Sequence, residues 1–282
     1  MINYFSCRDV DIKNVFDAFK VGFSDYMMKL EIDIDTFIKR FFGSEGNQLE
    51  NSFIALDGEE PIGLILGGIK DYEGLKTIRC GALCIHPDYR GKGVSKELFK
   101  LHKETAINKG CKQMFLEVIV GNDRAIKFYK NLGYDKIYDL SYFSCSDIRF
   151  HEKISLDLDI KKIDYHGIAK LRDSIVDIHI NWQNDFDYME KLDGLNYYGI
   201  YEDLDLIGAL CINQNGKIHF VYIESKYRKR GIGKMLISYA VRDMKLSKLF
   251  ISFPNNANLE GFLKHLGFTR DEISQYEMYL TL

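Results

Sequence analysis

Two short glycine-containing segments carry the residues whose types and spacing best suit chemistry. They read Arg90-Gly91-Lys92-Gly93-Val94-Ser95 and Arg228-Lys229-Arg230-Gly231-Ile232-Gly233. Exposed N–H groups and the positive end of a helix dipole make a strand-to-helix turn an anion site, and glycine lets phosphate oxygens approach the backbone. The segments therefore predict two phosphate cradles whose Arg and Lys side chains screen charge. An ordinary turn with solvated basic side chains is the alternative.

Two other phosphate-binding motifs do not fit these letters. The dinucleotide fingerprint G-x-G-x-x-G needs a third glycine, where the chain has Lys96 and Leu236. The nucleotide P-loop needs a glycine five positions before the Gly233-Lys234 pair and Ser or Thr after it, where the chain has Arg228 and Met235. Neither motif explains the glycines.

The chain also repeats itself. Residues 85–98 align with residues 223–236 at an offset of 138, and residues 128–134 align with residues 262–268 at an offset of 134. Two motifs in the same order and at similar spacing indicate a tandem repeat. The expected domains are therefore residues 1–146 and 147–282, with the boundary near Ser146 and Asp147.

Apolar periodicity predicts the same order of elements in both halves. For the first half, we expect two helices, a three-strand meander, then helix, strand, helix and strand, over residues 11–20, 34–42, 52–56, 61–69, 78–85, 96–107, 114–120, 123–132 and 137–145. For the second half, we expect strands near 198–201, 207–213 and 218–223, then helix, strand, helix and a final strand at 277–280.

These motifs closely resemble those of the GNAT superfamily of N-acetyltransferases. Residues 228–233 fit the family pattern R-x-x-G-x-[GA] fully, and residues 90–95 depart from it only at Ser95. Residues 122–134, NDRAIKFYKNLGY, resemble the second signature N-x-x-A-I-x-F-Y-x-x-L-G-[FY]. The resemblance covers nearly the whole of each half. It implies an α/β (α+β) fold of two tandem GNAT-like domains, each a mixed, mostly antiparallel, splayed sheet flanked by helices.

The resemblance also implies a function: transfer of an acetyl group from acetyl-CoA, as cosubstrate, to a primary amine by direct attack. The pantetheine arm would lie between the fourth and fifth strands. The residues that would hold the coenzyme in the first domain are Leu83 and Ile85 at the strand edge, Arg90, Gly91, Lys92, Gly93, Val94 and Ser95 at the pyrophosphate, and Asn122 and Phe128 at the thiol end. The matching residues in the second domain are Arg228, Arg230, Gly231, Ile232 and Gly233.

Two catalytic residues follow from the same resemblance. Tyr129 stands where the family places its general acid; an ordinary buried helix aromatic is the alternative. Glu117 lies twelve positions earlier on the fifth strand, an arrangement similar to that of ribosomal-protein alanine acetyltransferases. It could take the amine proton directly or through water, or it could anchor a neighbouring loop.

The second half lacks both groups. Leu263 stands at the position of Tyr129, and residues 251–255 contain no carboxylate. The second domain is therefore expected to be a scaffold or a vestigial coenzyme site, with the tandem domains acting as a pseudo-dimer.

The acceptor is expected to be a small-molecule or peptide amine, and the resemblance implies that its site is shaped by the first two helices, the sixth and seventh strands and the loop at residues 23–30. There Asp25 could attract a cationic amine or be merely solvated. A non-catalytic acyl-CoA sensor or assembly module is the rival function, in which both cradles bind ligand and neither transfers acetyl groups.

Composition narrows the class further. The 282 residues are 46% hydrophobic and 28% charged with a net charge of −3, which indicates a globular protein without a bulk electrostatic reason to bind nucleic acid. We expect no membrane partner and a cytoplasmic location, because no signal-like or membrane-spanning run is visible. The six scattered cysteines are expected to be reduced and mostly buried, and no metal site is expected.

Overall fold

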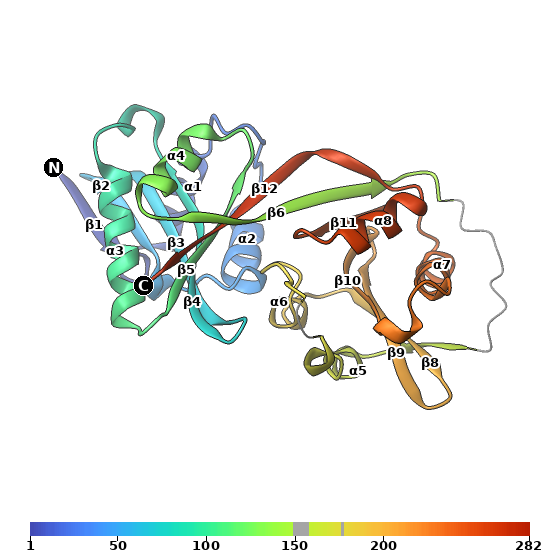
Figure 1. The fold of residues 1–282 in the computed structure, drawn as a ribbon. Helices are drawn as coiled ribbons and strands as arrows, with labels where there is room; N and C mark the ends of the chain where they lie inside the picture. The colour runs from blue at the N-terminus through green and yellow to red at the C-terminus, as the bar shows by residue number, and fades with distance from the viewer. Residues whose placement is uncertain (149–157, 176–177) are drawn as a thin grey trace. The chain divides into compact units, whose positions relative to one another are not determined.

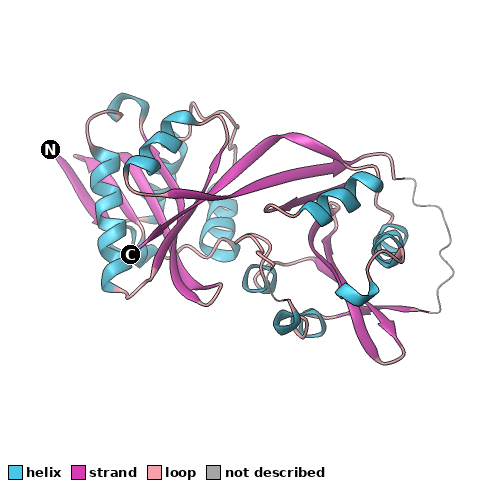
Figure 2. Ribbon diagram, viewed as in Figure 1, coloured by secondary structure: helices cyan, strands magenta, loops and turns pink. Residues whose placement is uncertain are grey.

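A computed structural model describes residues 1–148, 158–175 and 178–282, which form two compact units (Figure 1). Unit 1 comprises Met1–Ile137 together with Tyr276–Leu282, and unit 2 comprises Tyr138–Gln275. In each unit helices flank a mixed sheet (Figure 2). The expected fold class is confirmed.

Two strands, β6 (Asp135–Cys145) and β12 (Thr269–Thr281), run from one unit into the other. Unit 1 therefore obtains its last strand segment from the C-terminal residues of the chain. The boundary expected near Ser146 and Asp147 separates the two copies of the repeated motifs, whereas the compact units meet at Ile137 and at Gln275. As a boundary between the repeats it stays a prediction.

The sheet of unit 1 has the order β1-β2-β3-β4-β5-β12. Pairing is antiparallel from β1 to β4 and parallel between β4 and β5. The strands are β1 (Ile2–Ser6), β2 (Phe53–Asp57), β3 (Glu60–Tyr72), β4 (Leu75–Ile85) and β5 (Gln113–Ile119). The helices are α1 (Ile12–Gly22), α2 (Ile34–Phe37), which continues as the π-helical turn η2 (Ile38–Ser44), α3 (Val94–Asn108) and α4 (Asp123–Asn131).

Each face of the unit 1 sheet has its own apolar core, and the alternation of β3 side chains explains why. Leu64 packs with α1 and α2, whereas Ile65 packs with α3 and α4. On the first side Phe19 and Phe37 are buried, and on the second side Leu98 is buried. Helices on both faces thus cover the strands, as expected for a sheet that is apolar on both sides.

Unit 2 repeats this plan with the sheet order β12-β6-β11-β10-β9-β8-β7. Its further strands are β7 (Asp159–Ile163), β8 (Leu195–Glu202), β9 (Asp205–Asn213), β10 (Lys217–Ile223) and β11 (Leu249–Phe253). Its helices are α5 (Tyr165–Ala169), α6 (Phe186–Glu190), α7 (Ile232–Met244) and α8 (Ala257–His265). One core packs under α7 and α8, and another under α5 and α6.

The element order expected from the sequence matches the observed one except for the first strand of each unit. Strands β1 (Ile2–Ser6) and β7 (Asp159–Ile163) were not predicted, because their side chains are only half-buried or exposed and give a weak apolar signal. All six cysteines are buried and unpaired, as expected.

Candidate active site

The first glycine turn has the backbone conformation that its glycines predicted. Gly91 and Gly93 have φ of +74° and +88°, and Gly93 directly precedes α3. A Cβ atom at either glycine would meet no protein atom within 4 Å, so this backbone faces open space. No side chain caps α3. The first N–H groups of α3 are therefore available to an anion.

The second turn has the same conformation at the matching positions. Lys229 and Gly231 have φ of +62° and +79°, and Gly231 directly precedes α7. Lys229 is a non-glycine residue in the left-handed region, which costs about 1–2 kcal/mol. The repeat of this geometry, despite the loss of one glycine, indicates that the turn shape itself is shared by both units.

The arginine that opens each turn folds back onto the preceding strand. Arg90 Nε donates to the Ile85 carbonyl at 3.1 Å, and Arg228 Nε donates to the Ile223 carbonyl at 2.7 Å. Each arginine thereby closes the turn that follows β4 or β10. The expectation that Arg90 screens a pyrophosphate stays a prediction, and its guanidinium already has an anionic partner, Asp25.

Contacts to a tyrosine hold both turns in the same way. Lys92 Nζ lies 4.8 Å from the ring centre of Tyr89, and the Arg230 guanidinium lies 5.6 Å from that of Tyr227. The Tyr89 hydroxyl in turn bonds to Asp57 at 3.1 Å. The basic side chains thus lie over aromatic rings, where cation–π attraction stabilises them.

Strands β4 and β5 diverge a short way beyond their first residues. They pair only from Thr77↔Gln113 to Arg79↔Phe115, although β4 continues to Ile85. A bulge at Gly81 interrupts the pairing of β4 with β3, and Asn47 fills the space that a Cβ there would need. The edge that contains Leu83 and Ile85 is thus unpaired with β5. In unit 2, β10 and β11 likewise pair only at Lys217↔Phe250 and Ile218↔Ile251.

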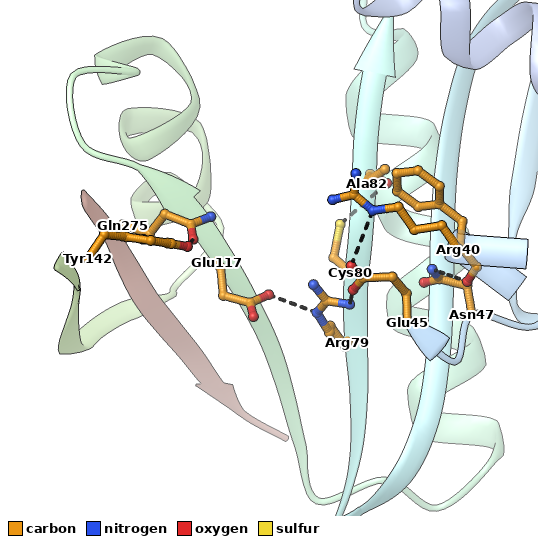
Figure 3. Close-up of polar contacts among 10 residues, drawn as sticks. Arg40, Glu45, Asn47, Arg79, Cys80, Ala82, Glu117, Tyr142 and Gln275 are labelled. Carbon is orange, nitrogen blue, oxygen red and sulfur yellow. Dashed lines mark hydrogen bonds and ion pairs between the residues drawn. The ribbon is translucent and has the colours of Figure 1, made fainter. Parts of the chain in front are cut away.

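Glu117 lies two residues beyond the last paired residue of β5, and its side chain is buried at 3% exposure. Its Oε2 accepts a 2.7 Å hydrogen bond from Arg79 Nε, as Figure 3 shows. Burial raises the pKa of Glu117 to about 7, against the opposing effect of the Arg79 charge. A carboxylate with such a pKa is suited to act as a base near neutral pH.

Tyr129 lies on α4, which the side chain of Asn122 caps by accepting from the Ala125 N–H at 3.3 Å. The phenol is buried, at 8% exposure, and burial raises its pKa well above the ordinary value. It therefore stays protonated and can donate a hydrogen bond. Phe128 packs beside it, with ring centres 5.5 Å apart.

The thiol of Cys80 interacts with both predicted catalytic groups. Its pKa is affected by the Tyr129 hydroxyl and by the charges of Arg79 and Glu117, and burial raises it to about 12. The thiol is therefore protonated and a poor nucleophile. Cys80, which directly follows Arg79, thus interacts with both Tyr129 and Glu117 close to the point where β4 and β5 stop pairing.

Unit 2 differs at both catalytic positions. Helix α8 has the same asparagine cap, Asn256 to the Leu259 N–H at 3.0 Å, but its buried Leu263 takes the place of Tyr129. By strand register, Ser252 takes the place of Glu117. The Ser252 carbonyl accepts from the buried side chain of Asn184 at 2.8 Å. An uncharged pair therefore stands where unit 1 has an ion pair.

Sequence reasoning missed Arg79, which contacts Glu117 directly, and Glu45, which contacts Arg79. Arg79 gave a signal, since it is a charged residue inside the apolar strand that ends at Ile85, and a fully buried arginine needs partners. Glu45 gave none, because it follows a helix in an otherwise ordinary loop.

Neither a metal centre nor a membrane span is present among residues 1–148, 158–175 and 178–282. No three His, Cys, Asp or Glu side chains there are grouped so as to hold a metal ion. No helix in those ranges is long and apolar enough to cross a bilayer.

Comparison with known proteins bears on both units. The model of the acetyltransferase (GNAT) family matches residues 13–134 and again residues 168–268. The chain is 36% identical over 61 residues to a thialysine N-epsilon-acetyltransferase of Bos taurus, which is 22% of this chain and 36% of that protein. It is 33% identical over 87 residues to N-alpha-acetyltransferase 30 of Schizosaccharomyces pombe, which is 30% of this chain and 57% of that protein. The matched region thus spans about a third of the first relative and little more than half of the second.

Solved structures share the tandem fold. A tandem GNAT protein from the clavulanic acid biosynthesis pathway superposes with a TM-score of 0.71 at 13% identity, over 100% of this chain and 98% of that one. A GCN5-related N-acetyltransferase from Kribbella flavida gives 0.67 at 13% identity, over 100% of this chain and 71% of that one. At such identities the likeness concerns the fold.

Proposed function

The chain belongs to the acetyltransferase (GNAT) family, and from that premise we propose that it transfers an acetyl group from acetyl-CoA to a primary amine, with the chemistry in unit 1. One observation carries the proposal. Strand β4 runs unpaired with β5 from Cys80 to the turn before the uncapped start of α3, and two buried groups, the Glu117 carboxylate and the Tyr129 phenol, both interact with Cys80 where the pairing ends.

The residues of unit 1 fit acetyl-CoA as cosubstrate. Gly91 and Gly93 present open backbone, and α3 begins with free N–H groups, which suits a pyrophosphate. The β4 edge at Leu83 and Ile85 is not paired with β5, so its backbone groups can bond to the pantetheine amides. Asn122, which caps α4, and Phe128 on α4 would lie toward the thiol end.

The proposed roles follow from the two pKa directions. Glu117, once ionised, takes a proton from the attacking amine, directly or through one water, as the nitrogen bonds to the acetyl carbon. Tyr129 stays protonated because burial raises its pKa, and it donates its hydroxyl hydrogen to the sulfur as the carbon–sulfur bond breaks. Glu117 then returns its proton to solvent, and solvent restores any proton that Tyr129 lost. Amide and thiol are the products.

We propose a primary amine of a small molecule or a peptide as the acceptor. Among the relatives, one is named for N-epsilon acetylation and another for N-alpha acetylation. The acceptor would lie against α1, α2 and the loop after α1. Asp25 in that loop is paired with Arg90, so its carboxylate is already engaged.

For unit 2 we propose coenzyme binding without acetyl transfer. Its turn at residues 228–233 keeps the same backbone conformation as the first turn. Leu263 and Ser252 offer neither the phenol nor the carboxylate. On this proposal the tandem repeats, divided near Ser146 and Asp147, work as an unequal pseudo-dimer.

The proposal is tested with the full chain, acetyl-CoA and a library of small and peptide amines. Release of free thiol should coincide with a mass gain of one acetyl group on some amine. Glu117→Gln should abolish most of that release while leaving coenzyme binding intact. If coenzyme binds to both units but no amine is acetylated, the acyl-CoA sensor or assembly module becomes the better function.

A further inference from the structure

Arg79 carries a buried guanidinium between two buried carboxylates. Its Nε donates to Glu117 at 2.7 Å and its Nη1 donates to Glu45 at 2.6 Å, and the three side chains are 3–5% exposed (Figure 3). Arg79 is also the last residue of β4 that pairs with β5. The charged triad therefore spans the point where the two strands begin to separate.

The ion pair uses only one oxygen of Glu117. Arg79 binds Oε2, whereas Oε1 is buried and has no hydrogen-bond partner among the described residues. A buried carboxylate oxygen without a partner is costly unless a ligand or water supplies one. Arg79 thus fixes the orientation of the carboxylate and leaves one lone-pair site open, as a base needs.

The charge around Glu117 comes from several elements. Arg79 opposes protonation, whereas burial and the nearby carboxylates Glu45 and Glu277 favour it. Three weakly acidic groups also interact with Glu117, namely Cys80 on β4, Tyr72 on β3 and Tyr279 on β12. Loss of the negative charge at position 45 should therefore favour the ionised form of Glu117, and loss of the positive charge at position 79 should favour the protonated form.

Glu45 directly follows the π-helical turn η2 and contacts Arg40 of that turn through both its backbone and its side chain. Its N–H donates to the Arg40 carbonyl at 2.9 Å, five residues back, and Arg40 Nε lies 3.7 Å from the Glu45 carboxylate. Phe41 in the same turn packs on Phe19 of α1, with ring centres 4.8 Å apart. Single π-turns are frequent at functional sites. Here the turn packs against α1 through Phe41 and contacts Arg79 through Glu45.

We propose that Arg79 and Glu45 are positioning residues for deprotonation of the acceptor amine: Arg79 orients the Glu117 carboxylate with Oε1 free, and Glu45 holds Arg79 in place. This inference rests on the proposed acetyl transfer. Neither residue touches the reacting atoms. Both act by setting where the Glu117 oxygens lie and at what pH they ionise.

The test compares pH profiles of kcat/KM for the full chain and its variants with one accepted amine. Glu45→Gln should move the acid limb to lower pH by about 1 unit, because a nearby negative charge is lost, and should keep most of the plateau rate. Arg79→Met should move that limb to higher pH and lower the plateau at least about tenfold. Arg79→Lys keeps the charge but cannot bond both carboxylates as the guanidinium does. It should return the acid limb to its original pH and recover only part of the plateau value of kcat/KM.

Glu104→Gln is the matched control, since it makes the same charge change at an exposed position of α3 and should leave the profile unchanged. A Glu45→Gln profile that coincides with that of the unmodified chain would overturn the proposal. If Arg79→Met does not fold, Glu45→Gln alone still decides.

A second measurement does not depend on turnover. The carboxyl stretch of Glu117, assigned by its loss in Glu117→Gln, is followed by infrared titration in the unmodified chain and in Glu45→Gln. A lower midpoint in Glu45→Gln supports the positioning role, and equal midpoints refute it. Absence of any acetylated product would instead refute the proposed function, so the two failures are distinguishable.

Discussion

The carboxylate of Asp25 accepts two hydrogen bonds from the guanidinium of Arg90, at 2.5 and 2.6 Å. The same guanidinium bonds to the Gly22 carbonyl at the end of α1. The pairing holds the pKa of Asp25 down at about 2. The loop that follows α1 is therefore fastened to the first cradle, and an anion that needs Arg90 must compete with Asp25.

Asp25→Asn should strengthen coenzyme binding by about 1.5- to 5-fold, because an exposed ion pair is worth roughly 0.2–1 kcal/mol and its loss frees Arg90. Calorimetric titration measures this on a background in which the second cradle is disabled. Asp9→Asn removes another exposed carboxylate that does not bond to Arg90 and should change little. Weaker coenzyme binding in Asp25→Asn would show that the Asp25–Arg90 ion pair supports the cradle rather than competing with its ligand.

The same ion pair has a small pH signature. The folded-state pKa of Asp25 is below the ordinary value of about 3.9, so its stabilisation is present above pH ~4 and is lost as the pH falls toward 2. Because Asp25 is about half exposed, the effect on the unfolding free energy should stay below about 1 kcal/mol.

Tyr129→Phe should lower kcat by about 10²-fold or more while coenzyme affinity stays the same, because it removes only the hydroxyl that we propose donates to the departing sulfur. The high pKa of this buried phenol makes it a hydrogen-bond donor first, so the loss should fall toward the lower end of the range for general acids. The rate of thiol release at saturating amine and acetyl-CoA, compared between the variant and the unmodified chain, measures this loss in kcat.

Tyr134→Phe is the matched control. Tyr134 is fully buried in the same core, its ring centre lies 5.8 Å from that of Tyr129, and its hydroxyl has no partner among the described residues. Its loss should leave turnover unchanged and cost no stability. Equal losses in both variants would mean that ring packing, not the Tyr129 hydroxyl, matters.

The cradle and the meander were predictable from the sequence because their signals are local. Glycines mark the turn at Gly91 and Gly93, and apolar alternation marks β2, β3 and β4. The Arg79 network was not predictable in the same way, since Glu45 and Glu117 lie 34 and 38 residues from it along the chain. Only the sheet register and the π-turn bring these charges together, and neither leaves a local pattern.

The pairing of the C-terminal strand end with the sheet of unit 1 was not predictable, for a related reason. Residues Glu277–Leu280 gave a correct strand signal, but an apolar strand can complete either sheet. Side-chain alternation determines which face of a strand is buried and not which neighbour it pairs with. Tyr276–Leu282 in unit 1 therefore could not be assigned from the pattern.

Gly93→Ala should weaken coenzyme binding to unit 1 strongly, because the new Cβ would project into the space that a phosphate needs. The left-handed backbone also disfavours alanine by about 1–2 kcal/mol. Gly58→Ala separates the two effects: Gly58, in the turn between β2 and β3, has φ of +63° and also faces open space. Both variants should lose similar stability on thermal unfolding, but only Gly93→Ala should lose coenzyme affinity. Loss of affinity in both would point to general destabilisation.

Disabling the second cradle should leave catalysis intact. Arg228→Ala removes the bond that closes the turn after β10, and Gly231→Trp places a large side chain at a residue with φ of +79° directly before α7. Calorimetry on this double variant should show that one of two coenzyme-binding events has disappeared. Because Leu263 and Ser252 provide neither an acid nor a base, acetyl transfer by unit 1 should continue at nearly the original rate. The reverse variant, Glu117→Gln with unit 2 unchanged, should be nearly inactive yet keep both binding events. If the cradle variant of unit 2 were the inactive one, the assignment of the chemistry to unit 1 would be wrong.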